Sequence, residues 1–141
     1  MDYTLKVSCS IENLKEIRSF VTKRLQDLSI NEIEINMMIL AVDEICANLI
    51  IHSNNSDESQ FLQVKIIEDS QGITFEIIDK GHPFDITSYQ VPTIENLVQS
   101  KRKGGLGLML VKRIMDKIEF TIEKDYTVCH LFKKVTFVHS A

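Results

Sequence analysis

The sequence has no tryptophan, and among its 141 residues it has only two prolines, five glycines and three cysteines. Cys9, Cys46 and Cys129 lie far apart and form no C-x-x-C pair, which argues against a disulfide framework or a cysteine zinc site, so we expect buried thiols. The chain also lacks the run of about 18 apolar residues that a membrane span needs. Its first residues lack the basic and then apolar layout of a signal peptide. We therefore expect a cytoplasmic protein with no membrane partner.

The chain is equally poor in basic clusters. Its formal net charge is -4, which argues against direct binding to nucleic acid, because such proteins usually carry a basic stripe. Apolar residues make up 44% and charged residues 26% of the sequence, as in an ordinary globular protein. The length suits one domain, and no repeat or linker interrupts it. We expect residues 1–141 to form a single domain.

Hydrophobic periodicity predicts the elements of this domain. Alternation with period two indicates strands, and apolar residues three and four apart indicate helices. The expected elements are a strand over Tyr3–Cys9, a helix over Leu14–Leu28, a second helix from about Glu32 to about Ile51, strands over Phe61–Asp69 and Ile73–Asp79, a helix over Leu106–Met115, and strands over Ile118–Lys124 and Thr127–Phe137. The order predicts an α+β fold, a two-layer α/β sandwich with a mixed, mainly antiparallel sheet and helices on one face. The other sheet face is left open to solvent or to a partner.

Three local features are expected at the junctions. Ser29 to Glu32 has the S-x-x-E form of a capping box at the start of the second helix. Gly72 stands in the turn between two strands, where a positive φ would favour glycine. The mixed stretch at about 84–104, with a short helical candidate over Ile94–Gln99, is expected to be a mobile lid.

The second helix is apolar nearly all round, which predicts a central helix packed against the sheet. Its polar exceptions, Glu44, Asn48 and His52, recur every four residues and so share one face. An Asn48 oxygen can bind a magnesium ion that also holds phosphates, and Glu44 can orient or deprotonate an attacking hydroxyl. The alternative is a buried polar pair that caps neighbouring backbone, with His52 as an ordinary histidine at a helix end.

Two further segments fit a nucleotide. Asp79 ends a strand and can accept the exocyclic amine of adenine, while Gly81 lets the backbone approach the ring. Gly104, Gly105 and Gly107 can present N–H groups to phosphates at a helix start, beside the cationic run 101–103. The alternatives are an ordinary Asp-Lys-Gly turn and a flexible hinge. No Walker loop, G-x-S-x-G turn or H-E-x-x-H motif is present.

Together these segments resemble the motifs of the GHKL ATPase superfamily, in family order. E-x-x-x-N at 44–48 is similar to its asparagine box, D-x-G at 79–81 to its first glycine box, and G-x-G-L at 105–108 to its second. Within the superfamily the sequence most resembles the bacterial anti-sigma-factor serine kinases, through its stretches 48–52, 78–85 and 104–111.

The resemblance implies that ATP binds under the lid with Mg²⁺ on Asn48 and with Glu44 as the catalytic base. The residues that it assigns to the nucleotide are Asn48, His52, Asp79, Gly81, Phe84, Lys103, Gly104, Gly105, Leu106, Gly107, Leu108 and Thr127. It also implies transfer of the γ-phosphoryl group to a serine of a small STAS-like antagonist protein, with a sigma factor as the other partner, and a homodimer.

Arg18 matches a position at which these kinases grip partners, although a solvated basic helix face explains it equally well. Two other functions stay open. One is an ATP-dependent binding module of the same fold that sequesters a regulator without kinase activity. The other is an α/β interaction domain that binds no nucleotide.

Overall fold

The computed structural model describes residues 2–53, 58–79 and 105–137. The elements in chain order are β1 (Asp2–Ser8), a 3-10 turn (Ile11–Asn13), α1 (Leu14–Asp27), α2 (Glu32–Asn48), a π-helical turn (Leu49–Ser53), β2 (Phe61–Glu68), β3 (Gly72–Asp79), α4 (Gly105–Ile114), β4 (Lys117–Ile122) and β5 (Thr127–Lys134). All the predicted strands and long helices are present. Their ends differ from the prediction by a few residues, and most at the end of β5.

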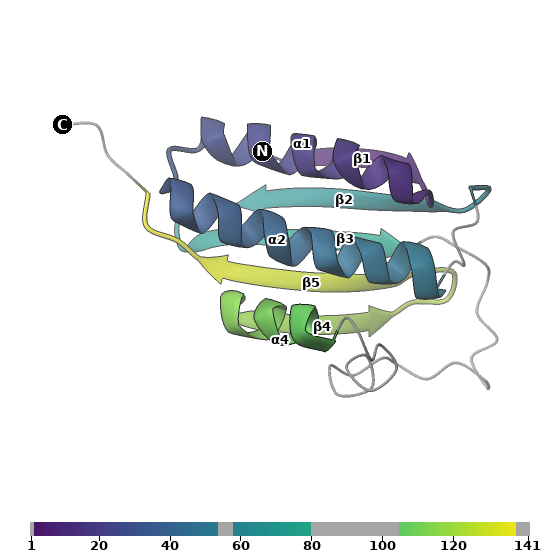
Figure 1. Ribbon diagram of the computed structural model, residues 1–141. Helices are drawn as coiled ribbons and strands as arrows, with labels where there is room; N and C mark the ends of the chain where they lie inside the picture. Colours follow the sequence, from purple (N-terminus) through teal and green to yellow (C-terminus); the bar gives the residue numbers. More distant parts are fainter. Residues whose placement is uncertain (1, 54–57, 80–104, 138–141) are drawn as a thin grey trace.

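The five strands form one sheet in the order β1-β2-β3-β5-β4, and the helices cover one of its faces (Figure 1). The predicted α+β class and two-layer architecture are confirmed. Every strand pairing among the described residues is antiparallel, where a mixed sheet was expected. Two of the pairings join strands that are neighbours in sequence, β2 with β3 and β4 with β5, and the β3–β5 pairing joins these two hairpins.

The core lies between the helices and the covered face of the sheet. The apolar stripe of α1 is buried as its spacing predicts. Alternate residues of β2 and β3 are also buried, as expected for strands with one covered face. Among the largest fully buried side chains are Ile17, Met38, Phe75, Ile77 and Leu131. Each contributes about 1.5–3 kcal/mol through removal of its surface from water. This packing fixes the position of α2 over the sheet.

α2 packs against the sheet as predicted, but its outer face is exposed although the helix is apolar nearly all round. Ile33 is 70% exposed, Leu40 48% and Met37 37%. The physical reason is the number of layers, because a two-layer sandwich has nothing above its helices to cover them. The apolar composition of α2 therefore exceeds what burial against the sheet requires.

The predicted capping box is wrong. The residue that caps α2 is Asn31, whose side-chain oxygen accepts a hydrogen bond from the backbone N–H of Ile33 at 2.8 Å. Ser29 instead has a φ of 58° and lies in the turn before the cap. The backbone of Asn31 is non-helical, with φ -54° and ψ 135°, as is usual for an N-cap residue. The hydrogen bond from Ile33 to the Asn31 side chain thus takes the place of the predicted contacts between Ser29 and Glu32.

The β2–β3 turn also differs from the prediction, because Gly72 does not have a positive φ. Asp69 closes the turn, with Oδ1 accepting hydrogen bonds from the N–H groups of Gln71 at 2.7 Å and Gly72 at 3.0 Å. Glycine is required for another reason. A Cβ at this position would lie 2.1 Å from the carbonyl oxygen of Lys133 on β5.

We expect Gly72→Ala to destabilise the protein by at least about 2 kcal/mol, because the backbone of β3 or β5 must shift to admit the methyl group. Urea unfolding followed by circular dichroism measures the change. The matched control is Ser70→Ala in the same turn, which is exposed and should stay within about 0.5 kcal/mol of wild type. An equal, small effect in both variants would contradict the proposed clash.

The three cysteines are free and buried, as predicted. Burial raises the pKa of Cys129 to about 12. Burial also raises the pKa of Cys46, and the nearby Cys129 thiol, Asp43 and Cys9 raise it further. Thiols that stay protonated and enclosed react poorly with oxidants and alkylating agents.

These two thiols make stability depend on pH in alkaline solution. Because their pKa values are raised by folding from 9.0, the folded protein keeps protons that the unfolded chain releases. The stabilisation is complete below about pH 9 and is lost as pH rises toward the folded values. We expect the free energy of unfolding to fall above about pH 9, by up to about 1.4 kcal/mol per pH unit for each thiol. Urea titrations at several pH values should show a shallower fall in Cys129→Ala, and identical slopes would contradict this origin.

Candidate functional site

Three polar side chains are buried, and they are the only ones among the residues that the structure describes. Asn48 is 4% exposed, Asp79 6% and Thr127 4%. They lie where α2 ends, where β3 ends and where β5 begins, at the same end of the molecule (Figure 1). Asp79 and Thr127 are direct partners in the β3–β5 register. The fold thus gathers residues from three elements that the sequence had singled out separately.

Two oxygen atoms in this group have no hydrogen-bond partner. The Asn48 side-chain nitrogen donates to the backbone carbonyl of Glu44 at 3.0 Å, so its orientation is fixed and Oδ1 is left over. The hydroxyl oxygen of Thr127 is also buried without a partner. Leaving a buried polar atom unsatisfied costs about 1–3 kcal/mol. Both atoms therefore fit a bound group that supplies a cation or a hydrogen-bond donor.

Glu44 lies one helical turn before Asn48 and is only half-buried. Residues four apart on an α-helix are neighbours on its surface, so the carboxylate lies beside the buried amide but nearer to solvent. A carboxylate in such a position is accessible to a hydroxyl group of another molecule.

His52 does not continue that helical face. The α-helix ends at Asn48 and the chain continues as a π-helical turn over Leu49–Ser53. A π-turn has more residues per turn than an α-helix, so the four-residue spacing no longer places side chains above one another after Asn48. The His52 backbone belongs to this turn, and its side chain is outside the described residues.

The predicted phosphate segment is described in part. Gly105, Leu106, Gly107 and Leu108 form the first turn of α4, whose free N–H groups are able to bind an anion. The start of α4 points toward the end of the molecule that holds Asp79 (Figure 1). The other predicted nucleotide residues, Gly81, Phe84, Lys103 and Gly104, and the predicted lid lie outside the described residues.

Arg18 lies on α1 and contacts the C-terminal half of α2. Its guanidinium Nη1 is 2.8 Å from Oδ1 of Asp43 on α2, and its side chain is 44% exposed. Asp43 was not among the predicted site residues, because no local sequence pattern links residues that lie 25 positions apart. Asp43 immediately precedes Glu44, so this ion pair joins the predicted partner residue to the helix that carries the predicted base.

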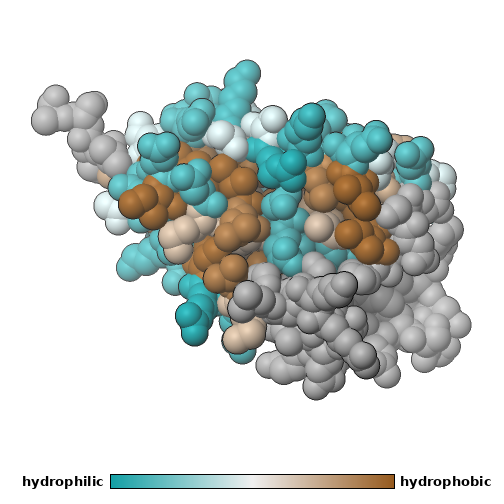
Figure 2. Space-filling model, viewed as in Figure 1, coloured by the Kyte–Doolittle hydropathy of each residue, from teal (hydrophilic) through white to brown (hydrophobic). Residues whose placement is uncertain are grey.

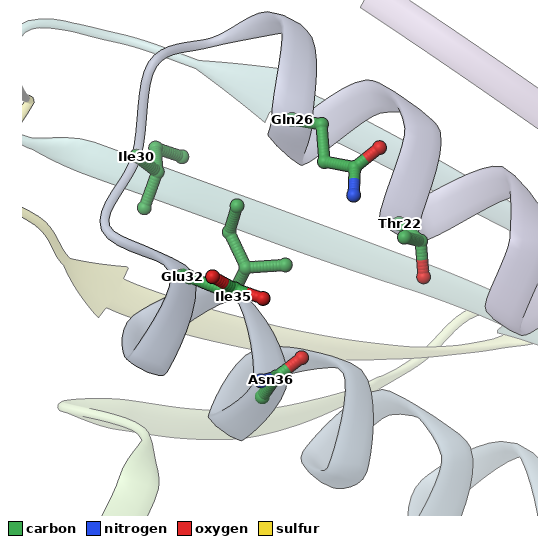
Figure 3. Close-up of a pocket in the computed structure, with 6 residues that line it drawn as sticks. All are labelled: Thr22, Gln26, Ile30, Glu32, Ile35 and Asn36. Carbon is green, nitrogen blue, oxygen red and sulfur yellow. The ribbon is translucent and has the colours of Figure 1, made fainter.

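A hollow of about 300 Å³ lies between α1 and α2 (Figure 3). Its lining residues are Thr22, Gln26, Ile30, Glu32, Ile35 and Asn36. Glu32 begins α2 and Asn48 ends it, so the hollow lies at the opposite end of the helix from the buried polar residues. It is therefore separate from the predicted nucleotide site.

The described residues offer neither a preformed metal cage nor a membrane-spanning helix. They contain no group of three or more His, Cys, Asp or Glu side chains that could enclose a metal ion. In the same part of the chain, no helix is long and apolar enough to cross a membrane.

Comparison with known proteins gives relatives of one kind. The chain is 28% identical over 99 residues to the serine-protein kinase RsbW of Bacillus licheniformis, covering 67% of this chain and 62% of the relative. It is 31% identical over 84 residues to the serine-protein kinase RsbW of Halalkalibacterium halodurans, covering 57% of this chain and 51% of the relative. The chain thus matches only part of the length of these relatives.

Among solved structures, the RsbU and RsbW domains of Rv1364c from Mycobacterium tuberculosis are similar, with a TM-score of 0.68 and 13% identity. The likeness covers 99% of this chain and 35% of that one, and at this identity it shows the fold. A profile of the histidine kinase-like ATPase domain matches residues 7–133, nearly the whole chain. The chain therefore belongs to the histidine kinase-like ATPase domain family.

Proposed function

We propose that this protein is an ATP-dependent serine/threonine protein kinase that acts as an anti-sigma, partner-switching regulator. The observation that carries the proposal is the group of Asn48, Asp79 and Thr127, buried at one end of an ATPase-family fold with two oxygen atoms unsatisfied. The relatives named serine-protein kinase support the type of reaction.

In this proposal Asp79 accepts a hydrogen bond from the exocyclic amine of adenine, and Thr127, its partner across the strands, completes the same network. The N–H groups at the start of α4 bind phosphate oxygens, together with Lys103 and Gly104. Gly81, Phe84 and His52 line the nucleotide. The lid at about 84–104 closes over it and excludes water.

Asn48 is the residue that would hold magnesium, because its Oδ1 is the unpartnered oxygen. Carbonyl oxygen is a suitable ligand for this hard cation. The ion, when bound, neutralises negative charge on the phosphates. The hydrogen bond from the Asn48 amide to the Glu44 carbonyl keeps that oxygen aimed away from its own helix.

Glu44 acts as the base. Its carboxylate takes the proton from a serine hydroxyl of the protein substrate, the serine oxygen forms a bond to the γ-phosphorus, and the bond from that phosphorus to the bridging oxygen of ADP breaks. The products are phosphoserine and ADP, and the proton stays on Glu44 until solvent removes it. Most of the rate enhancement in such a transfer comes from positioning and charge neutralisation.

The substrate is proposed to be a small STAS-like antagonist, and the alternative partner a sigma factor. Phosphorylation adds charge at the interface and so lowers affinity for the antagonist. Arg18 is proposed to contact these partners, and its ion pair with Asp43 must then be shared or displaced. A homodimer is proposed as the functional unit.

Transfer of label tests the proposal. The purified protein is incubated with Mg²⁺ and γ-labelled ATP in a lysate of its own host, and labelled proteins are separated by mass. We expect label on one small protein, released by phosphatase and stable in acid as phosphoserine is. If ATP binds and no protein becomes labelled, the kinase is rejected in favour of an ATP-dependent binding module.

A further inference from the structure

The exposed face of α2 carries an apolar row that neither the core nor the proposed nucleotide site uses. Ile33, Met37 and Leu40 lie four and three residues apart, so they form one ridge along the outer side of the helix. Ile33 alone is 70% exposed. Hydrophobic side chains gather on the face that the helices present, among hydrophilic ones (Figure 2). We call Ile33, Met37 and Leu40 the α2 ridge.

The charged side chains of α2 itself are all acidic, whereas the neighbouring helices α1 and α4 also carry basic residues. α2 contains four acidic residues, Glu32, Glu34, Asp43 and Glu44, and no lysine, arginine or histidine. Asp43 is ion-paired with Arg18 of α1, Nη1 to Oδ1 at 2.8 Å. Glu32 and Glu34, at the start of the ridge, have no cationic partner in the described part of the chain.

The acidic charge of α2 distinguishes between two candidate partners for the ridge, a second copy of the chain and a basic segment of another protein. A second copy of the chain placed on the α2 ridge through its own α2 would bring four acids against four acids, and like charges at an interface oppose association. A partner segment with basic residues beside its apolar ones would instead pair with Glu32 and Glu34. Such a segment matches the ridge in shape when it is helical, because its own apolar residues then recur at the same spacing.

The hollow between α1 and α2 extends the same surface. Asn36, which lines it, lies between Ile33 and Leu40 along the helix, and the buried side chains of Ile30 and Ile35 form an apolar floor (Figure 3). Four of the six lining residues are polar and one of them is Glu32, so a lysine or arginine side chain of a docked segment fits this hollow. Complementary pockets of this kind anchor helices in grooves.

We propose that the α2 ridge, with the hollow beside it, is a docking site for a basic amphipathic helix of a partner protein. Apolar residues of that helix pack on Ile33, Met37 and Leu40, and its lysine or arginine residues pair with Glu32 and Glu34. Glu44 continues the same helical face, about 16 Å beyond Ile33 at roughly 1.5 Å per residue. A helix docked on the ridge is therefore directed toward Glu44. The role of Glu44 as base rests on the proposed function, whereas the docking itself does not.

The test uses a synthetic probe and no nucleotide, so its result is independent of kinase activity. A fluorescein-labelled peptide with leucine at i, i+3, i+4 and i+7 and lysine elsewhere is titrated with the full chain, and anisotropy is recorded. A peptide of the same composition in scrambled order is the reference. We expect the amphipathic peptide to bind at least about tenfold more tightly than the scrambled one.

Two double variants locate the binding. Ile33→Ser with Met37→Ser and, separately, Glu32→Lys with Glu34→Lys should each weaken binding at least about tenfold. Matched controls are Ile11→Ser, another exposed apolar residue, and Glu119→Lys, an exposed acid on β4, and both should bind as wild type. Thermal melts check that all variants fold, above all the variant that carries Glu34→Lys, because Glu34 is partly buried.

Three results would overturn the proposal. Equal binding of the amphipathic and the scrambled peptide would mean that a lysine-rich peptide is attracted to this acidic protein by charge alone. Equal loss in the ridge variants and the controls would place the binding elsewhere. Light scattering that shows a wild-type dimer and a monomeric Ile33→Ser/Met37→Ser variant would assign the ridge to a second copy of the chain.

Discussion

Replacing Glu44 with glutamine is expected to lower phosphoryl transfer at least about 100-fold and to leave ATP affinity within about twofold of wild type. The amide has the size and shape of the carboxylate but cannot accept the serine proton. The backbone carbonyl of residue 44, which receives the Asn48 hydrogen bond, is unchanged by the substitution. Calorimetry measures ATP binding, and single-turnover transfer from γ-labelled ATP measures the chemical step.

The matched control for this experiment is Glu119→Gln, the same chemical change at an exposed position on β4. It should transfer label as wild type does. If Glu44→Gln transfers label at the wild-type rate, Glu44 is not the base. If it loses ATP binding together with transfer, the carboxylate has a structural part in the site, and the assignment of a catalytic base is withdrawn.

The second large effect is expected from Asp79→Asn, which should weaken ATP binding at least about 30-fold, equivalent to about 2 kcal/mol. Asp79 is 6% exposed, so an adenine amine that bonds to it is shielded from competing water. Asparagine keeps one oxygen but loses the charge that strengthens this hydrogen bond. Calorimetric titration with ATP measures the change, and guanine nucleotides in the same assay test whether residue 79 selects the base.

Asp27→Asn, an exposed aspartate at the end of α1, is the control and should bind ATP as wild type does. Because Asp79 is buried, circular dichroism and a thermal melt must show that the variant is folded. A folded Asp79→Asn protein with unchanged ATP affinity would reject the adenine assignment. It would also favour the third function considered above, an α/β domain that binds no nucleotide.

The sequence predicted the fold well because hydrophobic period is a local property. The alternation in β2 and β3 and the helical stripe of α1 appear directly as buried positions in the structure. The buried Asn48 and Asp79 were also predicted as site residues from their positions in apolar elements, whereas Thr127 was assigned only through the family resemblance. Their meeting at one end of the molecule was implied only by the family resemblance.

What the sequence did not predict depended on contacts between distant parts of the chain. Asp43 was missed because its partner Arg18 is on another helix. The apolar composition of α2 indicated burial but could not reveal that Ile33 and Leu40 face away from the sheet. Gly72 was explained by its turn, although the reason for glycine is the backbone of Lys133 on a strand that follows much later. Local patterns contain no information on which neighbour a surface meets.

The pairing of β3 with β5 has a consequence for how the chain folds. The hairpins β2–β3 and β4–β5 join strands that are close in sequence, whereas β3 and β5 are separated by residues 80–126, so closing them costs more chain entropy. Asp79 and Thr127 face each other across this long-range pairing of β3 with β5. A chain with both hairpins formed but not yet joined therefore lacks the complete pair of residues that we propose to bind adenine. Any ligand of that site stabilises only the fully assembled sheet and makes its opening rarer.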